Sequence, residues 1–264
     1  MSDDSATLWP RHRNTNDCSF CSILNFKQFA VSVHRTARMH SESFKCPSPD
    51  KDNSMIMSAP EALERLREGN HRFASDIRMR DVRTNRKRRR ELEAGQEPFA
   101  IILGCADSRV PAEIVFDQGL GDLFVIRVAG NIVAPSQVGS VEFAAEQTGA
   151  RLVVVLGHSM CGVVLATLDE LRRPKENRSP NLRAIVDRVR PSVEGLLTTD
   201  LGHDADSLVE LAVRANIRAS ADQLRCGSEI LEQMIESDGL LVVGAEYSLE
   251  TGRVDFFDGI PENA

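Results

Sequence analysis

The sequence predicts an α/β fold, in which a mainly parallel sheet of four strands plus an edge strand is flanked by helices and preceded by an N-terminal helical arm. The first observation behind this prediction is that short apolar runs alternate with longer segments of helical periodicity, as in strand–helix–strand units. The second is that the runs are apolar throughout rather than alternating in polarity, as expected of strands covered by helices on both faces.

The helical arm is predicted to begin near Ser58, whose hydroxyl can accept a backbone hydrogen bond at the start of a helix. Pro60 suits the first turn, and Glu61 is favoured there by the helix dipole. Four residues then recur at helical spacing along one face: Leu63, Leu66, Asn70 and Phe73. For the basic stretch from residue 78 to residue 90 we expect a solvated helix rather than a nucleic-acid site, because acidic residues follow it and no aromatic residues interleave.

Beyond the arm, apolar runs are predicted as strands, the last of them at the sheet edge: Ala100–Leu103, Leu123–Ile126, Leu152–Leu156, Leu240–Val243 and Val254–Phe257. The predicted helices are Pro111–Asp117, Gln137–Thr148, Gly162–Leu171, Leu182–Leu197 and Asp206–Glu236. The stretch Arg172–Pro180 is predicted to be an exposed loop. Neither an internal repeat nor a second boundary appears in this part, so we expect residues 58–264 to form one domain.

Residues 1–57 differ from the rest of the chain. They are rich in small polar and charged residues and show no sustained periodicity, so we expect a disordered segment or one that precedes a native start at Met55 or Met57. Cys18 and Cys21 form a single CxxC pair there, which without a second pair is a weak zinc signal.

Composition excludes several classes of protein. With Lys+Arg 32 against Asp+Glu 39, the chain of 264 residues has a formal charge of -7, which argues against a nucleic-acid partner. No apolar run approaches the roughly 18 residues of a membrane span, and the start lacks the apolar region of a secretion signal. The 6 cysteines are too few for a disulfide scaffold, so we expect a cytoplasmic protein whose cysteines serve a metal or catalysis.

Two predicted strands run directly into segments rich in reactive side chains. The first ends at Cys105, and the third ends at His158, with Cys161 three residues further on. Because functional groups gather at the carboxyl ends of parallel strands, these three side chains converge if the two strands are neighbours. Two thiolates and an imidazole suit Zn²⁺, and three protein ligands leave one coordination position open, as in catalytic sites.

From the segment that begins at Leu66 to the final strands, the sequence resembles the β-class carbonic anhydrases. The resemblance is carried by three segments in order: Cys105–Arg109 (CADSR), Phe124–Asn131 (FVIRVAGN) and Gly157–Gly162 (GHSMCG). It implies one Zn²⁺ per subunit, held by the two cysteines and the histidine named above, and a homodimer or a dimer of dimers. It also implies CO₂ and bicarbonate as substrate and product.

The implied reaction is the reversible hydration of CO₂ to bicarbonate and a proton by zinc-bound hydroxide. Asp107 and Arg109 are the expected catalytic residues. Asp107 would accept the hydrogen bond of the hydroxide and stay off the metal at neutral pH, while Arg109 would hold Asp107 ionised and oriented.

The resemblance also assigns a substrate pocket to Gln96, Phe124, Ala129 and Gly162. The amide of Gln96 would steady a substrate oxygen, and Gly162 would offer a backbone N–H. Phe124 and Ala129 match apolar positions that the family contributes across a dimer interface. Arg127 is expected to tie strand ends together rather than to bind an inhibitory bicarbonate, because Ile102 replaces the tryptophan of that pocket.

Other functions stay open from the sequence. A hydrolase of CS₂ or COS would share the same site residues, since an activated hydroxide can attack either carbon. A non-catalytic zinc module is disfavoured, because a closed structural site needs neither an open ligand position nor a polar pair beside it. A dinucleotide-binding protein is disfavoured because no GxGxxG follows the first strand.

Overall fold

The computed structural model describes residues 57–77, 85–173, 179–198 and 205–261. All of these lie in one compact unit, Lys51–Ala264. The predictions made for residues 1–56, including the Cys18–Cys21 pair, and for residues 78–84 of the basic stretch fall outside the described residues.

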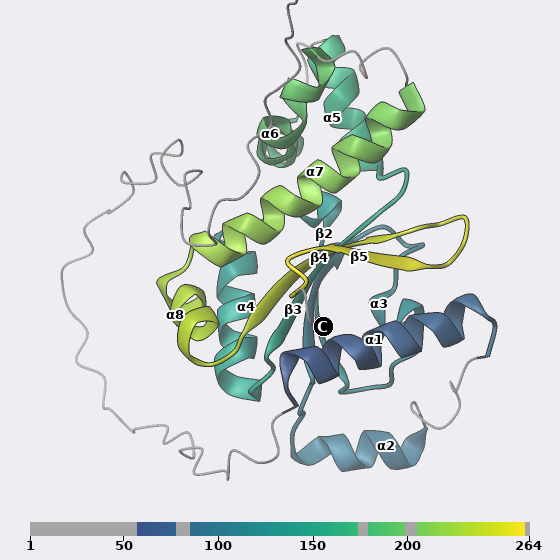
Figure 1. Ribbon diagram of the computed structural model, residues 1–264, viewed down its shortest axis with the longest axis vertical. Coiled ribbons are helices and arrows are strands. Elements are labelled where there is room, and N and C mark those ends of the chain that lie inside the picture. The colour runs from purple at the N-terminus through teal and green to yellow at the C-terminus, as the bar shows by residue number, and fades with distance from the viewer. Residues whose placement is uncertain (1–56, 78–84, 174–178, 199–204, 262–264) are drawn as a thin grey trace, which may run out of the picture. The chain divides into compact units, whose positions relative to one another are not determined.

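Within the described residues, the strands form one sheet in the order β2-β1-β3-β4-β5 (Figure 1). Their bounds are β1 Ala100–Cys105, β2 Leu123–Val128, β3 Leu152–His158, β4 Leu241–Tyr247 and β5 Val254–Asp258. Strands β1 to β4 run parallel to one another, and β5 pairs antiparallel with β4. The predicted α/β fold with four parallel strands and an edge strand is therefore confirmed.

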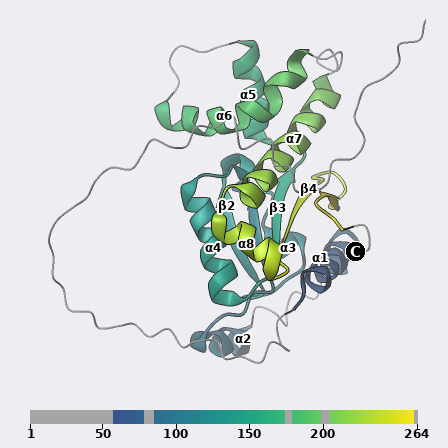
Figure 2. The ribbon, with the colours of Figure 1, turned by 60° about the vertical axis from the view of Figure 1, so that its left-hand side comes forward.

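The helices cover both faces of this sheet (Figure 2). Their bounds are α1 Ala59–Ala74, α2 Arg86–Glu91, α3 Ala112–Val115, α4 Pro135–Thr148, α5 Gly162–Arg172, α6 Pro180–Val193, α7 Ala205–Cys226 and α8 Glu229–Ser237. Short 3₁₀ turns lie at η1 Leu92–Ala94, η2 Ala129–Asn131 and η3 Glu194–Thr198. The arm helix α1 begins as predicted, because Ser58 and Glu61 form a reciprocal capping box.

Side chains of the central strands alternate between two apolar cores. Ile101 and Val153 pack on the side of α4 to α8, whereas Ile102 and Val154 pack on the side of α1 and α3. Both sets are fully buried, which explains why β1 and β3 read as continuous apolar runs. Both faces of the sheet are thus buried in apolar cores, and the segments with reactive side chains follow the carboxyl ends of its strands.

Several helices differ from their predicted bounds. The predicted helix Asp206–Glu236 is two helices, because Gly227 and Ser228 interrupt it and the Ser228 hydroxyl caps α8 by accepting a hydrogen bond from Leu231 N at 3.2 Å. The predicted helix Leu182–Leu197 is α-helical only as far as Val193 and continues as η3.

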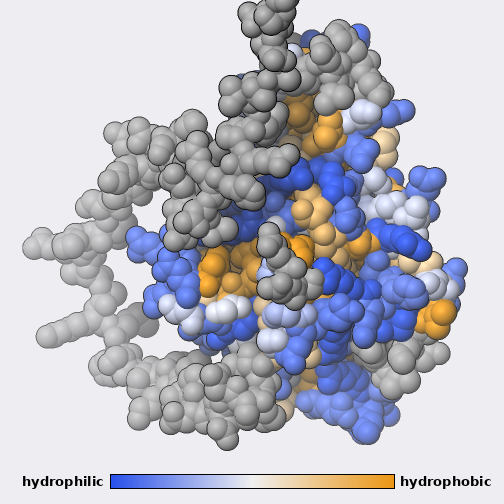
Figure 3. Space-filling view, viewed as in Figure 1, coloured by the Kyte–Doolittle hydropathy of each residue, from blue (hydrophilic) through white to orange (hydrophobic). Residues whose placement is uncertain are grey.

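The remaining differences concern short segments. The predicted helix at 111–117 shrinks to the single turn α3, which ends before Asp117, a residue with a left-handed φ of 47°. The end residues of the predicted loop, Arg172 and Pro180, belong to α5 and α6. Of the basic stretch, α2 forms a short helix with mostly exposed side chains, and the hydrophilic surface at the lower edge of Figure 3 lies over it. This agrees with the solvated helix that we expected.

The contact between α1 and the end of α3 depends on Gly69. A Cβ there would lie 1.9 Å from the carbonyl oxygen of Phe116, so Gly69→Ala is expected to destabilise the protein by about 1–3 kcal/mol through overpacking. Urea unfolding would measure this change. Gly139→Ala in α4 is the matched control: nothing lies within 4 Å of its Cβ, and a gain of about 0.5–1 kcal/mol is expected. Equal effects of the two substitutions would contradict the close approach of the α1 backbone to Phe116.

Candidate metal centre

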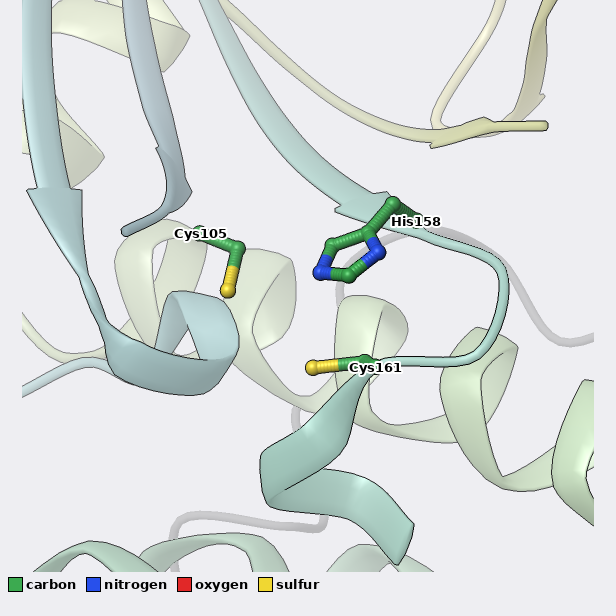
Figure 4. A group of neighbouring side chains, drawn as sticks. All are labelled: Cys105, His158 and Cys161. Carbon is green, nitrogen blue, oxygen red and sulfur yellow. The ribbon is translucent and has the colours of Figure 1, made fainter. Parts of the chain in front are cut away.

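Three ligand-type side chains converge at the carboxyl edge of the sheet (Figure 4). Cys105 is the last residue of β1 and His158 the last residue of β3, and these two strands are direct neighbours. Cys161 stands at the start of α5. The ligand atoms of the three residues lie within 4.8 Å of one another, and all three residues are buried. The predicted convergence of two sulfurs and one imidazole is therefore present.

The loop between His158 and Cys161 is held in place by β4 and the turn after it. Ser159 donates its N–H to the carbonyl of Tyr247 at 3.0 Å, and its hydroxyl accepts the N–H of Leu249 at 3.0 Å. Met160 then adopts a left-handed φ of 56°, which turns the chain back toward the cluster. This turn places Cys161, three residues after His158, beside the histidine ring.

The imidazole of His158 is oriented by its own loop. Its Nδ1 lies 2.9 Å from the carbonyl oxygen of Ser159, which accepts a hydrogen bond only if Nδ1 carries the proton. Nε2 then presents a lone pair, and this buried atom has no hydrogen-bond partner among the described residues. Figure 4 shows the ring facing the two sulfurs. A buried nitrogen lone pair that faces two sulfurs gives the set of one N and two S ligands that fits Zn²⁺.

Without a metal ion, the two cysteines differ in acidity. The pKa of Cys105 lies below that of a free thiol, and the pKa of Cys161 lies above it. The hydrogen bonds from Cys161 and from the N–H of Gly130 hold the pKa of Cys105 below its usual value despite burial. The Cys105 sulfur and burial raise the pKa of Cys161. A divalent cation would replace the shared proton and allow both sulfurs to be thiolates.

A carboxylate–guanidinium pair stands beside the cluster. Arg109 donates from Nε to Oδ1 of Asp107 at 2.9 Å and from Nη2 to Oδ2 at 2.7 Å, and its backbone N–H donates to Oδ1 at 3.0 Å. Oδ2 of Asp107 lies 3.8 Å from Nε2 of His158. One carboxylate oxygen therefore lies near the imidazole nitrogen that faces the sulfurs. Both carboxylate oxygens accept hydrogen bonds from Arg109.

The segment after β1 is tied to the neighbouring strand. Arg127 of β2 donates from Nε to the carbonyl of Cys105 at 3.2 Å and also donates to the carbonyl of Asp107. The expectation that Arg127 joins strand ends is confirmed. It fixes the backbone on both sides of Ala106, which lies between the thiol and the carboxylate.

The predicted substrate residues are not all near this cluster. Gly162 opens α5 next to Cys161, and Ala129 precedes Gly130, whose N–H donates to the Cys105 sulfur at 3.4 Å. Gln96, in contrast, is exposed and precedes β1, so the whole strand separates it from the cysteine of its own chain.

Phe124 is also remote from the cluster. It pairs in register with Ile101, near the amino end of β1, and its ring centroid lies 6.4 Å from that of Phe143. The structure brings together the three ligands and the Asp107–Arg109 pair, but Gln96 and Phe124 do not reach them within one chain.

Sequence reasoning missed three residues that surround the cluster. Ser159 orients the histidine, Gly130 donates to a sulfur, and Asn216 of α7 donates from Nδ2 to the carbonyl of Gly130 at 2.9 Å. Gly130 and Ser159 lie inside the segments that carry the resemblance, and this is the signal that marks them. No signal marked Asn216, which lies in the middle of a long helix.

Arg109 is expected to control the ionisation of Asp107. Its side-chain hydrogen bonds hold the pKa of Asp107 well below the usual value of about 3.9, so the pair stabilises the folded protein above about pH 4, and this stabilisation is lost as pH falls through the lowered pKa. In a ¹³C NMR titration, the Asp107 carboxyl should still be ionised at pH 4 in the native protein. In Arg109→Gln its pKa should rise. A carboxyl that titrates near its usual pKa in the native protein would contradict this account.

No helix in the described part of the chain is long and apolar enough to cross a membrane.

Comparison with known proteins identifies the family. The family model described as carbonic anhydrase matches residues 100–254, which include the cluster and the carboxylate–guanidinium pair. Carbonic anhydrase 2 of Mycobacterium tuberculosis is 39% identical over 202 residues, which cover 75% of this chain and 93% of that protein. This chain belongs to the β-class of the carbonic anhydrase family. The predicted class of enzyme, a lyase of the carbonate dehydratase type, is thereby confirmed.

Other carbonic anhydrases agree with this assignment. That of Mycolicibacterium smegmatis is 38% identical over 197 residues, which cover 74% of this chain and 91% of that protein. The solved structure of the β-carbonic anhydrase CcaA superposes with a TM-score of 0.58 at 28% identity and covers 75% of this chain and 95% of that chain. The β-carbonic anhydrase fold thus extends over most of the described residues.

Proposed function

We propose that this chain catalyses the reversible hydration of CO₂ to bicarbonate and a proton, with one Zn²⁺ per subunit held by Cys105, His158 and Cys161. The observation that carries the proposal is the convergence of three buried ligand atoms within 4.8 Å beside the carboxylate of Asp107. Two sulfurs and one nitrogen suit zinc, and three protein ligands leave a coordination position for catalysis. When bound there, Zn²⁺ supplies the Lewis acidity that makes coordinated water acidic near neutral pH.

Asp107 orients the nucleophile in this proposal. As an ionised carboxylate it only accepts hydrogen bonds, so a water or hydroxide that donates to Oδ2 has its remaining lone pairs directed away from the carboxylate. The low pKa of Asp107, caused by Arg109, keeps the carboxylate in this accepting form. The two side-chain hydrogen bonds from Arg109 also hold both carboxylate oxygens off the metal at neutral pH.

The proposed substrate pocket is mostly apolar, because CO₂ carries no charge and offers only weak acceptor oxygens. Ala129 adjoins Gly130, so we assign it as an apolar wall of the site in its own chain rather than across the dimer interface. The N–H of Gly162 is one of those that the first turn of α5 leaves without a helical partner, so it can donate to a substrate oxygen.

A second copy of the chain is proposed to complete the pocket. Gln96 and Phe124 do not reach the cluster of their own chain, and β2, which carries Phe124, is an edge strand of the sheet. Phe143 is 55% exposed beside Phe124, so an apolar surface borders this edge. We propose a homodimer or a dimer of dimers in which these two residues serve the partner's site.

Gln96→Ala is expected to lower kcat/KM for CO₂ on the order of tenfold, as loss of one hydrogen bond to a neutral group would. Zinc content and sedimentation should stay unchanged. Mixed dimers of a Gln96→Ala chain with a Cys161→Ser chain distinguish the two arrangements. If Gln96 acts across the interface, each mixed dimer holds one intact site and regains activity. Absence of such recovery would show that Gln96 does not serve the partner.

Stopped-flow CO₂ hydration by the purified protein, compared with sulfide release from COS and CS₂, tests the proposed function. Rapid CO₂ hydration that a zinc chelator removes would support it, whereas efficient sulfide release without CO₂ hydration would replace it by a hydrolase of the same fold.

We also propose that residues 58–264 suffice for activity, which a chain starting at Met57 would show. Thiolates that must stay free for zinc suit the reducing cytoplasm, the proposed location.

A further inference from the structure

The Cys105 sulfur is contacted by a backbone N–H from outside its own strand. Gly130, in the η2 turn after β2, donates to this sulfur at 3.4 Å. Gly130 has a left-handed φ of 74°, and a Cβ at this position would lie 2.8 Å from Cγ1 of Val163 in α5. Only glycine fits here, but glycine is also the residue whose backbone is least restrained by itself. The direction of this N–H must therefore be fixed by contacts around it.

Asn216 supplies such a contact from the other side. Its Nδ2 donates to the carbonyl of Gly130 at 2.9 Å, across 86 residues of sequence. Asn216 is 2% exposed in the middle of α7, and the adjacent Ile217 is fully buried in the apolar core. A buried amide is costly unless it is hydrogen-bonded, so an apolar residue would be the simpler choice at this position of α7. The side-chain NH₂ of Asn216 instead donates to the carbonyl of Gly130, the residue whose own N–H donates to the Cys105 sulfur.

We propose that Asn216 is a positioning residue of the metal centre, which holds the Gly130 carbonyl so that the N–H of the same residue stays directed at the Cys105 sulfur. The N–H and the carbonyl of Gly130 belong to consecutive peptide groups that share only the two backbone torsions of this glycine. Fixing the carbonyl therefore limits the directions that the N–H can take. This inference rests on the proposed function in that it takes Cys105 to be a metal ligand.

The consequence for the metal follows from charge. Two thiolates cancel the formal charge of Zn²⁺, whereas an N–H donated to one sulfur withdraws electron density from that thiolate. Loss of the N–H···S hydrogen bond would leave the charge of the buried thiolate less well stabilised, which weakens the site that holds the metal. It would also make the sulfur more electron-rich, which lowers the energy of sulfur-to-metal charge transfer. Removing a group that hydrogen-bonds to a metal ligand typically lowers metal affinity by about 10- to 100-fold.

The experiment compares two buried asparagines. Asn216→Leu and Asn216→Ala remove the donor to Gly130. Asn70→Leu is the matched control, because Asn70 is 6% exposed in α1 and also donates from Nδ2 to a glycine carbonyl, that of Gly252 at 2.9 Å, but lies outside the metal centre. Zinc affinity is measured by competition with a chromophoric chelator, and the sulfur-to-metal charge-transfer band is measured after loading with Co²⁺. Urea unfolding is measured for each protein.

Both Asn216 variants are expected to bind zinc about 10- to 100-fold more weakly than the native protein and to shift the Co²⁺ charge-transfer band to lower energy. Asn70→Leu should lose stability but keep the zinc affinity and the band of the native protein. Asn216 variants that lose stability alone, with unchanged zinc affinity and band, would overturn the inference, as would an equal loss of affinity in Asn70→Leu. Failure of the native protein itself to bind zinc would instead overturn the proposed function.

Discussion

Asp107→Asn is expected to reduce kcat/KM for CO₂ hydration by about 10²- to 10⁴-fold, the usual loss when a positioned acid–base group is removed. Asparagine keeps the shape of the side chain but places an NH₂ donor where a carboxylate oxygen accepts. It also cancels the charge that Arg109 binds at 2.7 Å, so the side chain loses its orientation. Zinc content should change little, because Asp107 is not one of the three ligands. Stopped-flow CO₂ hydration and metal analysis of the same sample provide the measurement.

The control for this substitution is Asp222→Asn. Asp222 also pairs with an arginine at 2.7 Å, that of Arg225, but on the exposed side of α7. It should leave CO₂ hydration unchanged, since exposed ion pairs contribute little. If Asp107→Asn kept activity within a few-fold of the native protein, the orienting role of Asp107 would be wrong. If it lost zinc together with activity, Asp107 would act by holding the metal.

Cys161→Ser is expected to abolish both zinc binding and CO₂ hydration. A serine hydroxyl does not ionise near neutral pH and is a harder donor than a thiolate, so only two ligands of the right kind remain. The loss of zinc affinity should exceed about 100-fold, the upper end of what residues behind the ligands contribute. Metal content after dialysis and stopped-flow hydration measure the two effects.

The matched control for this change is Met160→Leu, in the same loop. Met160 is 54% exposed and offers no ligand to the cluster, so its replacement by another apolar residue should leave the zinc content as it is in the native protein. Stoichiometric zinc in Cys161→Ser would show that the ion is held elsewhere, and the proposed ligand set would then be wrong.

The sequence was informative about the sheet and the ligands for a definite physical reason. Strands buried on both faces must be apolar throughout, so β1 and β3 are visible as runs that end at Cys105 and His158. Parallel neighbours end at the same edge, and this makes convergence of the two side chains predictable once the strands are adjacent. The arm was predictable from local chemistry, because a capping box involves only Ser58 and Glu61.

What escaped prediction depends on contacts between distant segments or on local interruptions. The break between α7 and α8 lies in a sequence whose apolar period continues on both sides, so the pattern does not reveal the interruption at Gly227 and Ser228. Asn216 reads as an ordinary polar residue of a helix, and its role depends on a carbonyl that lies 86 residues earlier in the chain. The remoteness of Gln96 from its own cluster becomes visible only when the direction of β1 is known.

Metal analysis of the purified protein, combined with removal and return of zinc, tests the central claim most directly. The account predicts one zinc per chain, loss of CO₂ hydration when a chelator strips it, and recovery when Zn²⁺ is added back. Protein that hydrates CO₂ without stoichiometric zinc, or that keeps its activity after the metal has been stripped, would contradict the account.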